Sequence, residues 1–228
     1  MAGTPDLYKV KERIITKRGK EMRDLSRKNL TKAASLAVAV LMMLAAVLAG
    51  AESADAAIKL HVTNKNARKA ARKVIKAANI NKSMRLKKKF RRCYRVIRNY
   101  SYGVTKDKAP KNRKQVYKLA LKTANRKYGK CYSYAVLTAT VAKALGYKNV
   151  RVKIGKIRRP GYGVREHAWC TVGKRIVDGS FDNSYKLRTG NKNLQFFMRT
   201  KKGILKNKIY PNFNGRIKYI KVNRTIKI

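Results

Sequence analysis

Three of the last four acidic residues in this chain lie close in sequence to a histidine. Beyond residue 57 the acidic residues are Asp107, Glu166, Asp178 and Asp182. His167 is the only histidine in the second half of the chain. A carboxylate can fix the tautomer and orientation of an imidazole, which then acts as a base and an acid toward a nucleophile. Acids placed beside His167 in so basic a chain therefore indicate chemistry.

Cys131 is the candidate nucleophile, since it follows Gly129 by two positions and stands where a helix is expected to begin. Unpaired N–H groups and the positive end of the helix dipole would favour the reactive thiolate there. The same N–H groups can form half of an oxyanion hole. Taken alone, Cys131 is more consistent with a buried structural thiol. The catalytic interpretation therefore depends on His167 and an acid lying near it.

A predicted hairpin brings His167 toward an acid. Strands are expected over 166–172 and 175–178, joined by a two-residue turn at 173–174. Counting outward from this turn gives the pairs Val172 with Arg175, Trp169 with Asp178, and His167 with Ser180. Directly opposed residues share a face, and diagonal neighbours lie roughly 7 to 8 Å apart. The register therefore predicts a hydrogen bond between His167 and Asp178.

The same register assigns lesser roles to the other two acids near His167. Asp182 has the same parity and lies diagonal to His167 on the other side, so it is the reserve acid. Glu166 points to the opposite face and is expected to pair with a nearby Lys or Arg.

Helices are expected in the first part of the region after residue 57. The predicted ranges are 63–80, 84–99, 114–127 and 131–145. The first is capped near Thr63 or Asn64, and the last is closed by Gly146. Apolar residues recur at spacings of three and four in 84–99 and on one side of 131–145, which is typical of half-buried helices.

Strands are expected after Gly146, where the apolar period changes to two. In addition to the hairpin, the predicted strands are 150–154, 204–210 and 216–228, and 158–163 is expected to be a loop. Helices followed by strands predict an α+β fold, with N-terminal helices packed on an antiparallel sheet. Residues 58–228 are expected to form a single domain.

Residues 1–57 have the composition of an export segment. Ten Lys and Arg residues precede an uncharged run at 33–50, and small residues follow it up to Ala56. This pattern predicts either a signal peptide cut after Ala56 or an uncleaved membrane anchor. The positive-inside rule keeps the N-terminus cytoplasmic in both cases, so the rest of the chain is expected to be secreted or held at the extracellular face of the envelope. A buried core helix is the alternative.

Residues 58–228 hold 49 of the 59 Lys and Arg residues and four of the ten acids, a net charge of about +45. Such a field attracts polyanions, and an exported protein meets anionic cell-wall or surface polymers. The densest cluster joins 87–89 to Arg91 and Arg92, which is also typical of a solvated helix face. Specific nucleic-acid binding is not expected, because no recognised motif accompanies the charge. A membrane contact is expected only through 33–50, if that run is uncleaved.

The remaining cysteines and aromatic residues near the motifs have structural alternatives. Three cysteines do not make a disulfide framework, so Cys93 and Cys170 are expected to be reduced and partly buried. A bridge between Cys93 and Cys170 is the alternative, and it depends on a packing that the sequence does not show. Trp169 is expected to be either a wall of the cleft or a core residue. Tyr102 and Tyr132 are expected to be packing residues, and lining the site is the second role considered for them. His61, far from any motif, is expected to be solvated, and no cofactor or metal is expected.

Together these motifs resemble a known family. Gly129-x-Cys131 opens a helix ending in Leu145-Gly146, and a strand, His167-Ala168-Trp169 and Val177-Asp178 follow in that order. This order over about 84–183 is similar to the bacterial transglutaminase-like superfamily, whose fold is related to that of papain. The resemblance implies that Cys131 is the nucleophile, His167 the general base and acid, and Asp178 the orienting carboxylate. The extreme basicity and Cys170 directly after the Trp depart from the commoner pattern.

The resemblance implies a thiol enzyme that acts on amide bonds of peptides or proteins through a thioester. Resolution by water would make it a peptidase or amidase, and resolution by an amine a cross-linking transferase. Hydrolysis is the expected outcome, and peptides of the cell wall or surface proteins are the expected substrates. The alternative is a cationic cell-surface binding module that kept the scaffold and lost turnover.

Overall fold

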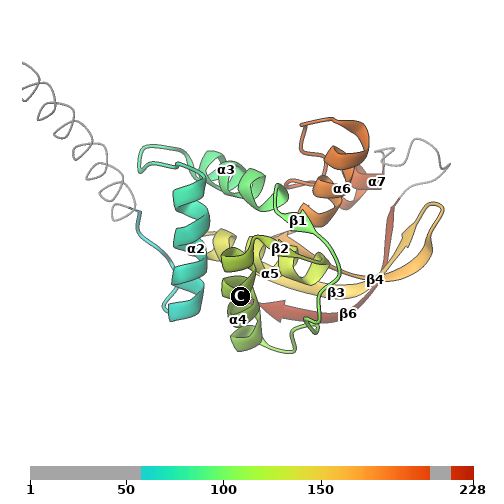
Figure 1. Cartoon of the computed structure of the whole chain (residues 1–228), viewed down its shortest axis with the longest axis horizontal. Coiled ribbons are helices and arrows are strands. Elements are labelled where there is room, and N and C mark those ends of the chain that lie inside the picture. The colour runs from blue at the N-terminus through green and yellow to red at the C-terminus, as the bar shows by residue number, and fades with distance from the viewer. Residues whose placement is uncertain (1–57, 206–216) are drawn as a thin grey trace, which may run out of the picture. The chain divides into compact units, whose positions relative to one another are not determined.

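Helices precede the sheet in the part of the chain that the structure, a computed structural model, describes, which is residues 58–205 and 217–228 (Figure 1). The first are α2 (Lys65–Ala77), α3 (Leu86–Arg98), α4 (Arg113–Arg126) and α5 (Cys131–Ala144). All four predicted helices are confirmed to within one turn. The side chain of Asn64 caps α2 by accepting hydrogen bonds from the N–H groups of Asn66 and Ala67, as the cap prediction required.

The helix that begins at Cys131 lies at the centre of the fold. Every side chain of α5 except that of Lys143 is buried. The helix packs against α2, α3, α4 and the strands behind them. A helix that is apolar all round must be enclosed, so the prediction of a single buried side is wrong for this helix. Its start is correspondingly well fixed.

The sheet is antiparallel, with strand order β5-β4-β3-β6. Its strands are β3 (Val150–Arg159), β4 (Gly163–Val172), β5 (Arg175–Val177) and β6 (Lys218–Lys227). The helices and antiparallel sheet together confirm the α+β prediction. β3 and β4 pair along their whole length, out to Arg159 opposite Gly163. The loop predicted at 158–163 is therefore reduced to a tight turn, because the strands continue to satisfy each other's backbone groups.

The last strand, β6, pairs with β3 on the edge opposite to β4. β6 confirms the strand predicted at 216–228, and its pairing with β3 shifts register around Gly155. A Cβ added at Gly155 would lie 1.9 Å from the carbonyl oxygen of Lys221, so only glycine allows β6 to come this close. Gly155 is also the direct partner of His167 on β4.

Two short elements differ from the predictions. The strand predicted at 204–210 is wrong where it can be followed, because α7 (Lys201–Leu205) is helical and residues 206–210 lie outside the described ranges. Thr200 accepts a hydrogen bond from the N–H of Gly203 and so starts that turn. The helix α6 (Gly179–Thr189) follows β5 directly and was not predicted.

Apolar side chains form two clusters on the two sides of β4. Ala168, Cys170 and Val172 join the core formed by α2–α5, whereas Trp169 belongs to a second cluster with Phe181, Phe196 and Tyr219 among others. Alternation along the strand produces this division. Trp169 is therefore a core residue, one of the two roles expected for it.

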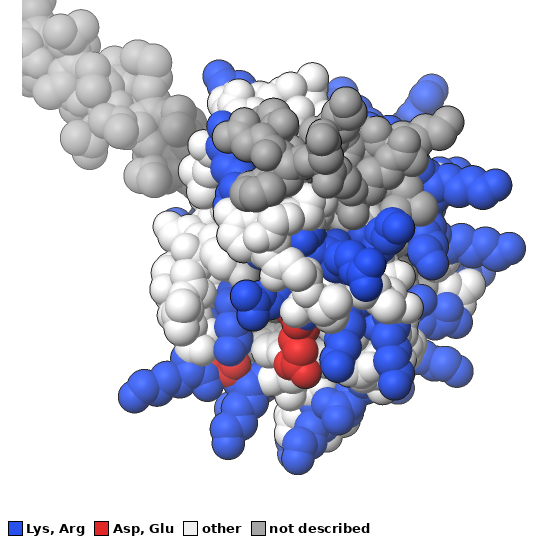
Figure 2. Space-filling view, turned by 90° about the vertical axis from the view of Figure 1, so that its right-hand side faces the viewer, with Lys and Arg blue, Asp and Glu red and all other residues white. Residues whose placement is uncertain are grey.

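Basic side chains are spread over the face shown in Figure 2 and project from its edges, and acidic side chains occupy only small areas of it. The cluster at 87–89 with Arg91 and Arg92 lies on the solvated side of α3, as expected. No helix among the described residues is long and apolar enough to cross a bilayer. The export segment predicted at 1–57, including the run at 33–50, lies outside the described ranges.

Candidate active site

The hairpin of β4 and β5 has the predicted register only close to its turn. Val172 faces Arg175 and Cys170 faces Val177, but the pairing ends there. The predicted cross-strand partners of Trp169 and His167, Asp178 and Ser180, are therefore wrong. The chain leaves the sheet because Asp178 caps α6, accepting a hydrogen bond from the N–H of Phe181 at 3.3 Å.

His167 and Asp178 are nevertheless in direct contact. The distance from His167 Nε2 to Asp178 Oδ2 is 2.6 Å, and both side chains are buried. Asp178 also accepts hydrogen bonds from the hydroxyl of Tyr219 at 3.0 Å and from the hydroxyl of Ser180 at 2.8 Å. Both carboxylate oxygens are thus held by neighbouring groups, which fixes the direction in which the acid faces the imidazole.

The charge on Asp178 controls the protonation of His167. Burial by itself lowers the pKa of His167, because it disfavours the charged ring. The nearby charge of Asp178 and its hydrogen bond, together with a hydrogen bond and charge interaction with Cys131, outweigh burial and raise this pKa to about 10. The imidazole is therefore protonated at neutral pH. Since Nε2 faces Asp178, Nδ1 is the nitrogen left for the sulfur.

Cys131 lies at the first position of α5, with only 8% of its surface exposed. The side chain of Lys130, at the N-cap, makes no capping hydrogen bond, so it does not occupy the N–H groups of the first turn. A Cβ added at Gly129 would lie 2.3 Å from the side chain of Ser133 in that turn. Glycine two positions before the sulfur therefore lets the chain enter the helix at this angle.

A two-strand bridge places a tyrosine beside the sulfur. β1 (Ser101–Tyr102) pairs in parallel with β2 (Tyr128–Gly129), and Tyr102 lies opposite Gly129. The Tyr102 phenol forms a hydrogen bond with the backbone of Cys131. Burial, and next the charge of Cys131, raise the pKa of Tyr102 to about 12, so the phenol keeps its proton. Tyr102 thus lines the site, the second of the roles expected for it.

A cleft of about 320 Å³ opens onto His167. Besides His167 it is lined by Tyr102, Arg159, Tyr162, Ser180, Phe181, Ser184 and Arg188. The guanidinium of Arg159 lies 4.7 Å from the centre of the Tyr162 ring, and Arg188 donates to the Tyr162 hydroxyl at 3.3 Å. Cations and aromatic rings therefore frame the entrance of the cleft.

The reserve acid is not at this site. Asp182 is fully buried in α6, where it accepts hydrogen bonds from the Tyr94 hydroxyl and from the N–H groups of Gln195 and Phe196. Burial raises the pKa of Asp182 to about 6 against the opposing effect of these hydrogen bonds. It holds the 195–196 segment to α6 and does not contact His167, because residues 179–189 form a helix and not the continued strand.

The other residues named from the sequence lie apart from the pair. Glu166 accepts a hydrogen bond from the Tyr132 hydroxyl at 3.3 Å, a different partner from the expected Lys or Arg. Cys93 and Cys170 are free thiols, as predicted, and both are fully buried where partial burial was expected. Burial raises the pKa of both thiols, that of Cys93 to about 12. His61 is exposed, as expected.

The sequence reasoning missed Tyr219 and the arginines at the cleft entrance. Tyr219 donates to Asp178 from a strand whose place in the sheet was not predicted. The alternation of Ile217 and Tyr219 with Lys218 between them was the available signal in the sequence. Arg159 and Arg188 had no signal, since they are two basic residues among many. Within the described residues, no group of three or more His, Cys, Asp or Glu side chains is placed to hold a metal ion.

The model of the transglutaminase-like superfamily matches residues 69–174 of the chain. The match includes Cys131 and His167, and it ends four residues before Asp178. No curated protein matches the chain.

Proposed function

We propose that this chain, whose residues 69–174 match the model of the transglutaminase-like superfamily, hydrolyses amide bonds in peptides or proteins. That superfamily includes cysteine enzymes. In this proposal Cys131 is the nucleophile, His167 the general base and acid, and Asp178 the carboxylate that orients His167. The observation that supports it most is the contact of 2.6 Å between His167 and Asp178 beside a cysteine at a helix start.

The reaction begins with Cys131 as the thiolate and with the proton on His167. The thiolate of Cys131 attacks the amide carbonyl carbon and forms a carbon–sulfur bond, while the carbonyl oxygen takes up the negative charge. N–H groups at the start of α5 stabilise that oxygen. His167 then gives its proton to the amide nitrogen, the carbon–nitrogen bond breaks, and an amine leaves behind a thioester on Cys131.

Water resolves the thioester in the second half of the reaction. His167, now neutral, takes a proton from the water as it attacks, and the carbon–sulfur bond breaks to release an acid. Asp178 stabilises the imidazolium in both halves and keeps Nδ1 directed at the reacting atoms. An amine in place of water would give cross-linking. Hydrolysis is the proposal because water reaches a solvent-facing cleft without any further binding site.

We further propose that the enzyme acts outside the cytoplasm on peptides of the cell wall or of surface proteins. The proposal rests on the composition of residues 1–57 and on the excess of basic residues after them. Anionic cell-wall or surface polymers would concentrate such a protein near its substrates. A reporter fused to the C-terminus should therefore be found outside the cytoplasm, and finding it in the cytoplasm would overturn export.

Alkylation by iodoacetamide tests the catalytic assignment without a known substrate. Cys131 should react much faster than Cys93 and Cys170, both fully buried thiols with a raised pKa. The substitution His167→Ala should slow the reaction of Cys131, and unfolding temperatures should verify that this variant is folded. Equal rates at the three thiols, or a rate at Cys131 indifferent to His167, would count against the enzyme.

The alternative of a cationic binding module predicts a different pattern. Adhesion to anionic cell walls would then be salt-sensitive and unchanged in Cys131→Ser, and a peptide library would trap no thioester on the wild-type protein. The buried His167 and Asp178 pair favours the enzyme, because a module that binds through surface charge has no use for it.

A further inference from the structure

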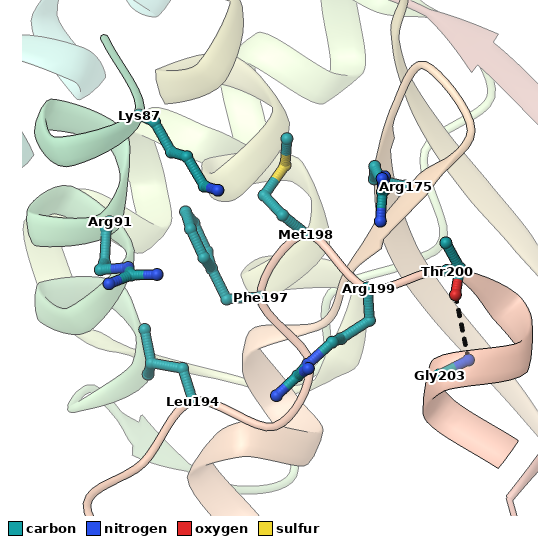
Figure 3. Close-up of a pocket in the computed structure, with 9 residues that line it drawn as sticks. All are labelled: Lys87, Arg91, Arg175, Leu194, Phe197, Met198, Arg199, Thr200 and Gly203. Atoms are coloured by element: carbon teal, nitrogen blue, oxygen red, sulfur yellow. Dashed lines mark hydrogen bonds between the residues drawn. The ribbon is translucent and has the colours of Figure 1, made fainter. Parts of the chain in front are cut away.

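A second pocket, distant in sequence from Cys131, has the composition of an anion site. It has a volume of about 280 Å³ and is formed by α3, β5 and the segment 194–203. We call it the cationic pocket, and it is lined by Lys87, Arg91, Arg175, Leu194, Phe197, Met198, Arg199, Thr200 and Gly203. Four of these residues are cations and none is an acid. In Figure 3, Lys87 and Arg91 extend from α3 toward Phe197 and Met198, and Arg175 approaches from the other side.

We propose that the cationic pocket binds a phosphate group, either free or esterified to a small organic group. Its four cations come from three separate elements, α3, β5 and the segment 194–203, and they line one hollow with an apolar floor. A phosphate ester carries about −1.5 to −2 charges at pH 7 and three strong acceptor oxygens, which several cations together can satisfy. Arginine matches that geometry with two parallel N–H donors.

The floor of the cationic pocket is apolar and built into the fold. Phe197 is buried and contacts the rings of Phe90 and Tyr94, with ring centres 5.2 and 5.0 Å apart. The guanidinium of Arg91 lies 5.7 Å from the centre of the Phe197 ring, which restrains its direction. An organic group attached to the phosphate would pack on Phe197 and Met198 while the cations hold its oxygens.

Hydrogen bonds hold the wall of the pocket in position before any ligand arrives. The backbones of Arg199 and Ile176 exchange two hydrogen bonds, of 2.7 and 3.0 Å, and the Arg199 Nε donates to the carbonyl of Gln195. Met198, which precedes Arg199, has a φ of 55°. Residues other than glycine seldom adopt this left-handed backbone conformation, and it often occurs at binding sites. A site whose wall is already fixed loses little entropy on binding.

The protein supplies no counter-charge to these cations within its described part. Asp107 pairs with Lys122 and Arg126, and Glu166 accepts from Tyr132. Asp178 and Asp182 are buried with the partners described above. Four like charges facing one hollow repel one another unless an anion enters it, so occupation by an anion relieves that repulsion.

Titration calorimetry of the full chain with inorganic phosphate and with glycerol 3-phosphate, at constant ionic strength in chloride, tests the proposal. Saturable binding of one equivalent is expected. The double substitution Arg91→Gln and Arg199→Gln should weaken it about tenfold or more, and Arg175→Gln alone should weaken it by less. Tighter binding of glycerol 3-phosphate would identify an ester as the ligand, and equal binding would identify free phosphate; either supports the site.

The matched control removes two arginines from α2 that are also exposed, Arg68→Gln with Arg72→Gln. This double variant has the same net charge as the pocket variant and should bind phosphate like the wild type. An equal loss in both variants would mean that net charge alone attracts the anion, and would overturn the proposal. So would non-saturable binding to the wild type. The measurement does not depend on catalysis, so its failure leaves the proposed reaction untouched.

Discussion

The candidate active site and the cationic pocket both contact the segment 194–199, but their charged groups lie in opposite environments. At the site, the N–H of Asp178 donates to the carbonyl of Phe196, and the ionisable groups are buried and paired with each other. In the pocket, four exposed cations face solvent without an acidic partner among the described residues. A buried charge requires a partner to be tolerated, whereas an exposed one is hydrated.

The difference predicts where substitutions will matter. Removing one member of the buried pair leaves its partner uncompensated, so both reactivity and stability should change. Removing cations from the pocket should change binding and leave the fold intact. Variants of the two regions should therefore differ: those at the buried pair should lose reactivity and stability, and those at the pocket should lose only anion binding.

The largest effect is expected from Asp178→Asn. A neutral amide cannot stabilise the imidazolium of His167 and favours the wrong tautomer, so alkylation of Cys131 by iodoacetamide at pH 7 should slow by roughly 10- to 100-fold. Asp182→Asn is the matched control, because it makes the same change in a buried acid that does not contact His167. Equal slowing in both folded variants would contradict the assignment of Asp178.

Stability should fall with rising pH over the range that His167 controls. Its pKa is raised from 6.5 to about 10, so its contribution is fully present below about pH 6.5 and is lost as the pH rises toward 10. The slope is at most about 1.4 kcal/mol per pH unit for one proton. Urea denaturation at several pH values should show this slope in the wild type and a flatter one in His167→Gln. Identical slopes would mean that the pair is not coupled.

Tyr219→Phe should cost about 1 to 3 kcal/mol, because it removes a buried hydrogen bond to a carboxylate and keeps the ring that packs on Trp169. Tyr162→Phe is the matched control at the exposed cleft entrance, where the loss should stay below about 0.5 kcal/mol. Urea denaturation measures both. If Tyr162→Phe lowered the unfolding free energy as much as Tyr219→Phe, burial would not explain the stabilisation by Tyr219.

The smallest effect on stability is expected from Arg91→Gln with Arg199→Gln. Lost stacking on Phe197 and relieved repulsion among the cations oppose each other, so unfolding free energy should change by about 0.5 kcal/mol or less. Repulsion is screened by salt, so the variant should be relatively more stable at low ionic strength. Destabilisation by several kcal/mol would mean that the pocket is part of the core and not a binding surface.

The sequence predicted the local elements well where one pattern extended over many residues. The helices α2 to α5 and the start of α5 at Cys131 follow from apolar spacing, caps and Gly146. It predicted the contact of His167 with Asp178 through a hairpin that is correct for three pairs and then ends. The proximity was right because both residues follow closely on the same turn, although the cross-strand pairing assumed for them was wrong.

Prediction was weaker where a choice depends on contacts between distant segments. Asp178 could continue a strand or cap a helix, and the fold selected the cap, which moved Asp182 away from His167 and into contact with Tyr94. Tyr219 reaches Asp178 only because β6 lies beside β3, a pairing between segments about 60 residues apart that local periodicity does not encode.

The sequence by itself determined the α+β class, the cysteine at a helix start, and the neighbouring histidine and acids, because these follow from short-range spacing and residue chemistry. Only the tertiary structure decided which acid faces His167, which tyrosine supports that acid, and which few of the many basic residues converge on one pocket. Those outcomes depend on the packing of segments far apart in the chain, and the apolar periodicity of one segment does not specify which distant segment packs against it.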